Sequence, residues 1–237
     1  MDLMRIGIGC HSGLGRRRGH DAGTGPDVRR PVPGHCVVML LQMTAPGALP
    51  AELREQVETL ADSGRPALVA VDGRCGSGKT TLAAALGRVF GCPVVHTDDY
   101  YLPFDRRPRD WQNTPAANMD FARLRAEVLD PLRAGKDGLC RPYDCHTGRF
   151  GAEYGLPAGG LLVLEGSYSH HPLLGEYDLR VFVTCPSECR ARRLQEREGE
   201  RYEMFRSRWI PLEEGYFRAF SVEQKADCVV NTGPADN

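Results

Sequence analysis

The chain has 237 residues and a formal net charge of −1. This length suits one α/β domain with some additional sequence, and the balanced charge excludes a global basic field for nucleic acid. No apolar run approaches the roughly 20 residues of a membrane-spanning helix. The nine cysteines form no paired C-x-x-C halves, which indicates reduced thiols in a cytoplasmic protein rather than a zinc site.

Residues 1–46 are rich in Gly, Pro and Arg and show no sustained periodicity. An organelle presequence would contain few acids, whereas this segment has Asp2, Asp21 and Asp27. The arginine run at residues 16–18 could contact a polyanion, but one short run is weak support. The interpretation we favour is a disordered extension, translated from an upstream start.

The first regular elements are a helix and a strand. Leu53, Val57 and Leu60 recur at helical spacing within residues 50–64. The apolar run ALVAV at residues 67–71 follows, and it predicts a buried strand of a parallel sheet.

The sequence GRCGSGKT at residues 73–80 fits the pattern G-x-x-x-x-G-K-[ST]. It lies between that strand and a helix expected over residues 80–90, which is the context that a phosphate-binding loop requires and that disfavours a glycine-rich turn binding nothing. Glycines let backbone N–H groups point at a phosphate, the lysine reaches the β- and γ-phosphates, and the threonine ligates Mg²⁺. The residues expected to bind the nucleotide are Gly73, Gly76, Ser77, Gly78, Lys79, Thr80 and Thr81.

A second short strand is expected at residues 93–97, and it ends at Asp98 and Asp99. Acids just past a strand of an open parallel sheet lie where such folds bind ligands. The polar stretch at residues 104–120 has no clear period, and its length predicts a binding loop. A helix is expected over residues 121–132.

A third apolar strand, LLVL, ends at Glu165. Downstream of a complete phosphate loop, this pattern indicates a carboxylate that holds Mg²⁺. Further strands are expected at residues 179–184 and 227–230, with a long helical region at residues 201–222.

Residues 186–198 predict a helix that is dense in arginine. The helix could present a solvated charged face, or it could act as a lid that brings guanidinium groups to transferring phosphates. Arg193 and Arg197 are four residues apart and therefore share one face. The residues alone favour neither interpretation.

Together and in this order, the phosphate loop, DDYY, NMD, RPYD, LEG and the arginine-rich helix resemble the uridine kinase and phosphoribulokinase group of P-loop kinases. The resemblance covers about residues 67–230. It implies that Asp98 is the base for the substrate hydroxyl, that Glu165 is linked to Mg²⁺, and that Arg193 and Arg197 are lid arginines.

The resemblance also implies three substrate-binding residues. Tyr101 would lie near a nucleoside, Asp120 would bind ribose hydroxyls, and Tyr143 would lie beside the base. Two positions depart from the nucleoside kinases, because Met119 and Cys145 stand where those enzymes have Phe. Both changes remove aromatic surface for stacking on a pyrimidine.

The sequence therefore predicts an α/β P-loop NTPase fold of the nucleoside-kinase type, with a five-stranded parallel sheet and an arginine-rich lid, over residues 47–231. Residues 232–237 are expected to form a tail. The predicted enzyme transfers the γ-phosphate of ATP or GTP, with Mg²⁺, to the 5′-hydroxyl of uridine or cytidine. The alternatives are a kinase of another small alcohol, such as a sugar phosphate or a pantothenate-like compound, and a nucleotide-binding regulatory NTPase. No nucleic acid or membrane partner is expected, and a homo-oligomer stays open.

Overall fold

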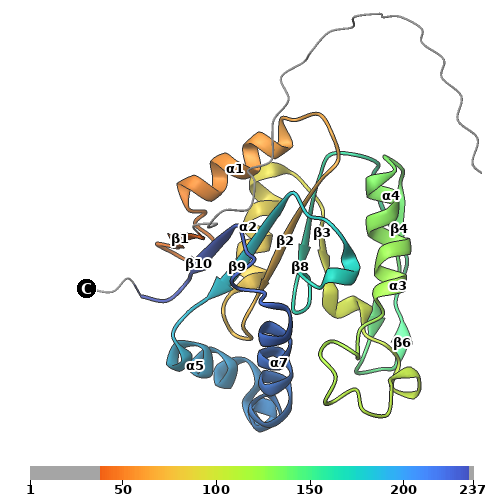
Figure 1. The fold of residues 1–237 in the computed structure, drawn as a ribbon, viewed down its shortest axis with the longest axis vertical. Helices are drawn as coiled ribbons and strands as arrows, with labels where there is room; N and C mark the ends of the chain where they lie inside the picture. The colour runs from red at the N-terminus through yellow and green to blue at the C-terminus, as the bar shows by residue number, and fades with distance from the viewer. Residues whose placement is uncertain (1–37, 235–237) are drawn as a thin grey trace, which may run out of the picture. The chain divides into compact units, whose positions relative to one another are not determined.

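A six-stranded parallel sheet forms the centre of residues 38–234, the part of the chain that the computed structural model describes (Figure 1). Its strand order is β1-β10-β9-β2-β8-β3, and every neighbouring pair is parallel. The strands are β1 (Met39–Gln42), β2 (Ala67–Gly73), β3 (Val94–His96), β8 (Leu161–Glu165), β9 (Leu179–Thr184) and β10 (Cys228–Asn231).

The central strands are buried on both faces, as their continuous apolar sequences predict. All seven residues of β2 and all five of β8 are buried. Alternate side chains enter two separate cores: Leu68 and Leu162 belong to one core, and Val69 and Val163 to the other. Helices cover the sheet on both sides (Figure 1), so the α/β class predicted from the sequence is confirmed.

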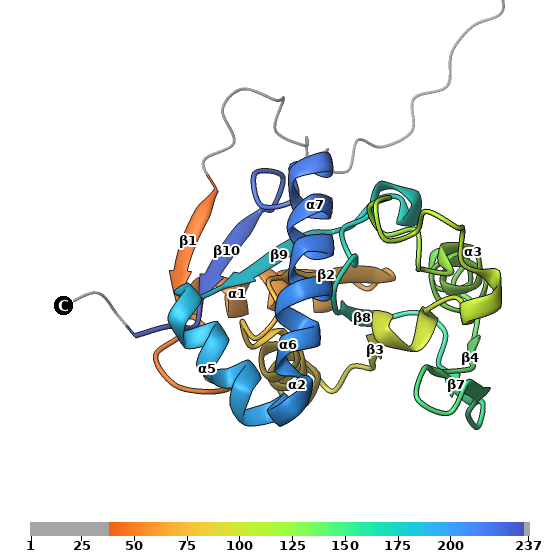
Figure 2. The ribbon, with the colours of Figure 1, turned by 90° about the horizontal axis from the view of Figure 1, so that it is seen from below.

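The helices are α1 (Ala51–Ala61), α2 (Lys79–Phe90), α3 (Phe121–Leu124), α4 (Asp130–Arg133), α5 (Ser187–Glu198), α6 (Tyr202–Met204) and α7 (Ile210–Phe220). A wider π-helical turn, Arg125–Leu129, joins α3 to α4, and a second one, Phe205–Trp209, joins α6 to α7. In Figure 2, α5 leads into α6, and α7 continues from there along the sheet. Every helix among residues 38–234 is too short or too polar to cross a membrane.

Two small antiparallel ladders fill the irregular region between α4 and β8. The first pairs β4 (Gly138–Cys140) with β7 (Tyr154–Leu156), and the second pairs β5 (Tyr143–Asp144) with β6 (Arg149–Phe150). The β5–β6 ladder carries Tyr143, whose ring lies 5.3 Å from that of Phe150.

The sheet has one strand more than the five that the sequence predicts. β1 pairs with β10, with Leu40 opposite Val229, and the N–H of Met43 donates to the carbonyl of Asn231 at 2.9 Å. Leu41 and Met43 are buried. The boundary expected at residue 46 is therefore wrong for β1, because this four-residue edge strand is too short to show a period of its own. Residues 1–37 of the expected extension and residues 235–237 of the expected tail lie outside the described residues.

Candidate active site

A cavity of about 920 Å³ lies at the carboxyl ends of β2, β8 and β3. Its walls come from the phosphate loop, the segments after β3 and β8, the β5–β6 ladder and the arginine-rich helices, which are far apart in sequence. The predicted site residues that line it are Gly76, Ser77, Gly78, Lys79, Thr80, Thr81, Asp98, Tyr101, Tyr143, Glu165, Arg193 and Arg197. Gly73 and Asp120 are the predicted site residues that do not.

Gly73 begins the phosphate loop and has a packing role. Its φ is +142°, and a Cβ at this position would lie 2.1 Å from the carbonyl oxygen of Val183 on β9. Only glycine allows the loop to leave β2 this close to the neighbouring strand. Gly73 thus fixes the direction of the loop rather than lining the cavity.

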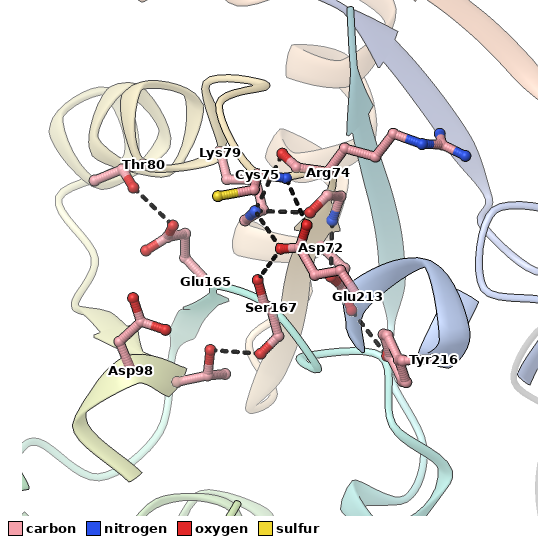
Figure 3. Close-up of polar contacts among 12 residues, drawn as sticks. Asp72, Arg74, Cys75, Lys79, Thr80, Asp98, Glu165, Ser167, Glu213 and Tyr216 are labelled. Atoms are coloured by element: carbon pink, nitrogen blue, oxygen red, sulfur yellow. Dashed lines mark hydrogen bonds and ion pairs between the residues drawn. The ribbon is translucent and has the colours of Figure 1, made fainter. Parts of the chain in front are cut away.

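Lys79 lies inside the loop at the N-terminus of α2. Its Nζ donates to the carbonyl oxygens of Gly73 at 2.7 Å and Arg74 at 3.3 Å, and lies 3.9 Å from Oε1 of Glu213 (Figure 3). Burial alone would lower the pKa of Lys79, but surrounding acidic groups, Glu213 foremost, hold it above its usual value. The lysine therefore carries a fixed positive charge at the loop.

Thr80 and Glu165 meet next to Lys79. The Thr80 hydroxyl donates to Oε1 of Glu165 at 2.8 Å, and Nδ1 of His96 lies 2.5 Å from Oε2 of the same carboxylate. Burial would raise the pKa of Glu165, yet the hydrogen bonds from His96 and Thr80 lower it. The sequence did not indicate His96, since a single histidine at the end of a strand is not a distinctive signal.

This pair of oxygen ligands fits Mg²⁺, which prefers one or two carboxylates together with substrate phosphates. Among residues 38–234, no group of three or more His, Cys, Asp or Glu side chains could hold a metal by itself. Thr80 and Glu165 are therefore the side chains that would hold a Mg²⁺ ion brought in with the nucleotide.

Glu165→Gln should raise the Mg²⁺ concentration needed for half-maximal rate by on the order of tenfold. The substitution keeps the shape of the side chain and removes the charge that faces the ion. Nucleotide affinity measured without metal should change much less. A Mg²⁺ titration of the rate that matches the wild type would contradict this assignment.

Asp98 and Asp99 lie in the single turn Thr97–Tyr100 that follows β3, and both line the cavity. The Tyr101 hydroxyl donates to Oδ1 of Asp98 at 3.3 Å. Although Asp98 is accessible from the cavity, the surrounding protein desolvates it, and this together with the charge of Glu165 raises its pKa. Desolvation also raises the pKa of Asp99.

Asp120 has a local structural role. Its Oδ1 accepts from the backbone N–H of Arg123 at 3.1 Å, which caps α3, and its Oδ2 lies 3.6 Å from Nε of the same arginine. The structure does not bring Asp120 to the cavity wall, so the contact with ribose hydroxyls that the resemblance implies stays a prediction.

Aromatic side chains from distant elements meet at the cavity, Tyr101 from the segment after β3 and Trp209 from the turn before α7. The Trp209 ring lies 6.4 Å from that of Tyr101 and 6.0 Å from that of Trp111. Met119, by contrast, is buried in the core, while Cys145 lies at the cavity beside Arg107. Trp209 thus adds aromatic surface to the cavity from a distant element, which sequence spacing could not reveal.

The two predicted lid arginines differ in their surroundings. Arg193 donates to the Thr232 hydroxyl and carbonyl, both at 2.9 Å, and to the Gly76 carbonyl at 3.4 Å, so it ties α5 to the loop. The Arg197 side chain is 58% exposed and pairs with Glu198 at 2.7 Å. Arg197 is therefore the more exposed of the two, and it lines the cavity although its partner Glu198 has a side chain that is only 9% exposed.

These features define a P-loop kinase fold: a complete phosphate loop between β2 and α2, an acid at the end of β8, and acids after the neighbouring β3. A family model described as an AAA domain matches residues 69–213, more than half of the chain, so the protein belongs to this family. Comparison with curated proteins found no match.

Two solved structures share the fold. One is described as a possible uridine kinase from Bacillus stearothermophilus, with 22% identity and a TM-score of 0.55 over 76% of this chain and 99% of that one. The other, a candidate fructose transport system kinase from Silicibacter sp. TM1040, has 21% identity and a TM-score of 0.57 over 76% and 97%. The resemblance to P-loop kinases seen in the sequence is confirmed, and at this identity it concerns the fold.

Proposed function

We propose that this protein is a kinase that transfers the γ-phosphate of ATP or GTP to a hydroxyl of a small molecule. One observation carries the proposal: Lys79 of the phosphate loop and the carboxylate of Asp98 line the same cavity. A nucleotide switch needs no base beside an acceptor pocket, whereas phosphoryl transfer to an alcohol does.

Each site residue has its own role in the proposed reaction. Lys79 and Arg197 neutralise charge on the transferring phosphate, because phosphoryl transfer depends on positioning and electrostatic stabilisation. Thr80 and Glu165 would hold Mg²⁺, which neutralises charge between the phosphates when bound. Asp98 accepts the proton of the acceptor hydroxyl as it attacks, and its raised pKa favours that step.

For the acceptor, uridine or cytidine is our first choice. Tyr101, Tyr143 and Trp209 provide aromatic surface at the cavity, which suits a planar base. A sugar or sugar phosphate is the second choice, favoured by the name of the Silicibacter structure, a candidate fructose transport system kinase.

The test is ADP release from the full chain with ATP and Mg²⁺, with and without a panel of nucleosides, sugars, sugar phosphates and pantothenate. We expect release that depends on one acceptor class, with mass spectrometry showing one phosphate added to the acceptor. Slow release that no acceptor stimulates would contradict the kinase proposal and would favour the regulatory NTPase.

A further inference from the structure

A carboxylate that the sequence did not single out lies against the phosphate loop. Glu213, on α7, is buried. Its Oε2 accepts from the backbone N–H of Cys75 at 2.8 Å, and its Oε1 accepts from the Ser167 hydroxyl at 2.5 Å and lies 3.9 Å from Nζ of Lys79 (Figure 3). The carboxylate of Glu213 is thus surrounded by donor groups of the phosphate loop and of the segment after β8.

This position puts negative charge next to the loop that is expected to bind phosphates. The phosphate loop is built to attract negative charge, through its N–H groups, its lysine and the N-terminus of α2. A buried carboxylate 3.9 Å from Lys79 satisfies part of that attraction before any ligand binds. A terminal phosphate placed on Lys79 would meet like charge from Glu213 where screening by water is weak.

We propose that Glu213 is an internal counter-anion of the phosphate loop, which competes with the terminal phosphates of a bound nucleoside triphosphate for Lys79 and thereby sets nucleotide affinity. This inference rests on the proposed function, since it concerns the same phosphate loop.

The chain offers a matched control on the same helix. Glu214 is adjacent to Glu213, but its Oε1 pairs with Nε of Arg74 at 2.9 Å rather than with Lys79. The substitutions Glu213→Gln and Glu214→Gln therefore remove the same charge from neighbouring positions, and only the first removes it from beside Lys79.

The experiment measures the dissociation constants of a non-hydrolysable ATP analogue, ADP and AMP by calorimetry with Mg²⁺. Glu213→Gln should bind the ATP analogue about tenfold more tightly than the wild type, because one like charge near the phosphates is gone. The gain should be smaller for ADP and absent for AMP. Glu214→Gln should change these affinities by less than about twofold.

Both variants should fold, because α7 is also held by the hydrogen bond from the Tyr216 hydroxyl to Asp72 and by the packing of Phe217 on Phe182. Glu213→Ala is the second variant and has the same expected direction, so the test does not depend on the glutamine side chain. Melting curves without nucleotide verify folding.

Unchanged or weaker binding of the ATP analogue to the Glu213 variants, or an equal gain in Glu214→Gln, would overturn the inference and leave the proposed function standing. An equal gain for ATP analogue, ADP and AMP would also overturn it, since it would reflect a general structural effect. If neither the wild type nor any variant binds nucleotide, the proposed function fails and this inference fails with it.

Discussion

Lys79→Ala is expected to abolish phosphoryl transfer, with a loss of about 10³-fold or more in kcat, while the protein stays folded. The lysine is partly buried within the loop, where its Nζ donates to two loop carbonyls and lies 3.9 Å from the Glu213 carboxylate. It therefore supplies charge to the phosphates and little packing to the core. The measurement is acceptor phosphorylation, together with a melting curve that should shift by no more than a few degrees, about the effect of 1 kcal/mol.

The matched control for this change is Lys136→Ala. Lys136 is exposed, lies between α4 and β4, and does not line the cavity. Its removal should leave the rate within about twofold of the wild type, as surface substitutions away from special features usually do. Near-normal turnover of a folded Lys79→Ala protein would refute the assignment of the phosphate loop.

The features that the sequence predicted well are those encoded by adjacent residues. The phosphate loop carries its glycines, lysine and threonine in one octapeptide, and the buried strands appear as unbroken apolar runs. The positions of Asp98 and Glu165 follow from the rule that the carboxyl ends of parallel strands share one edge of the sheet. Each of these predictions needs only local pattern and strand direction.

The features that the sequence did not predict arise from contacts between distant segments. In the sequence, Glu213 is one of several charged residues of a predicted helix. No residue near it in the sequence shows that it contacts a loop 138 residues away. Trp209 lies beside Tyr101 and Trp111 only in the folded chain, because these residues are far apart in the sequence. β1 forms a strand because it pairs with the edge of β10. The four residues of β1 alone do not show this pairing.

Asp98 follows β3 at the same edge of the sheet as Lys79, and its substitution is the decisive test of the proposed chemistry. Asp98→Asn should lower kcat by about 10²-fold or more, the usual scale for loss of a general base, and leave ATP binding intact. The amide keeps the size of the carboxylate and can still accept the hydrogen bond that Tyr101 donates at 3.3 Å. What it loses is the ability to take the proton of the attacking hydroxyl.

Asp99→Asn is the control that tests whether Asp98 or the adjacent Asp99 is the base. Asp99 follows directly in the same turn and also lines the cavity, but its backbone carbonyl is held by Nη2 of Arg123 at 2.6 Å, and its carboxylate could face Mg²⁺ or stabilise the turn. Rates of acceptor phosphorylation and ATP affinities of both variants separate these roles. If Asp99→Asn is the slower enzyme, Asp99 and not Asp98 is the base. If neither change slows phosphorylation in proteins that fold and bind ATP, the mechanism proposed here is wrong, because both acids of the turn after β3 are then excluded as the base.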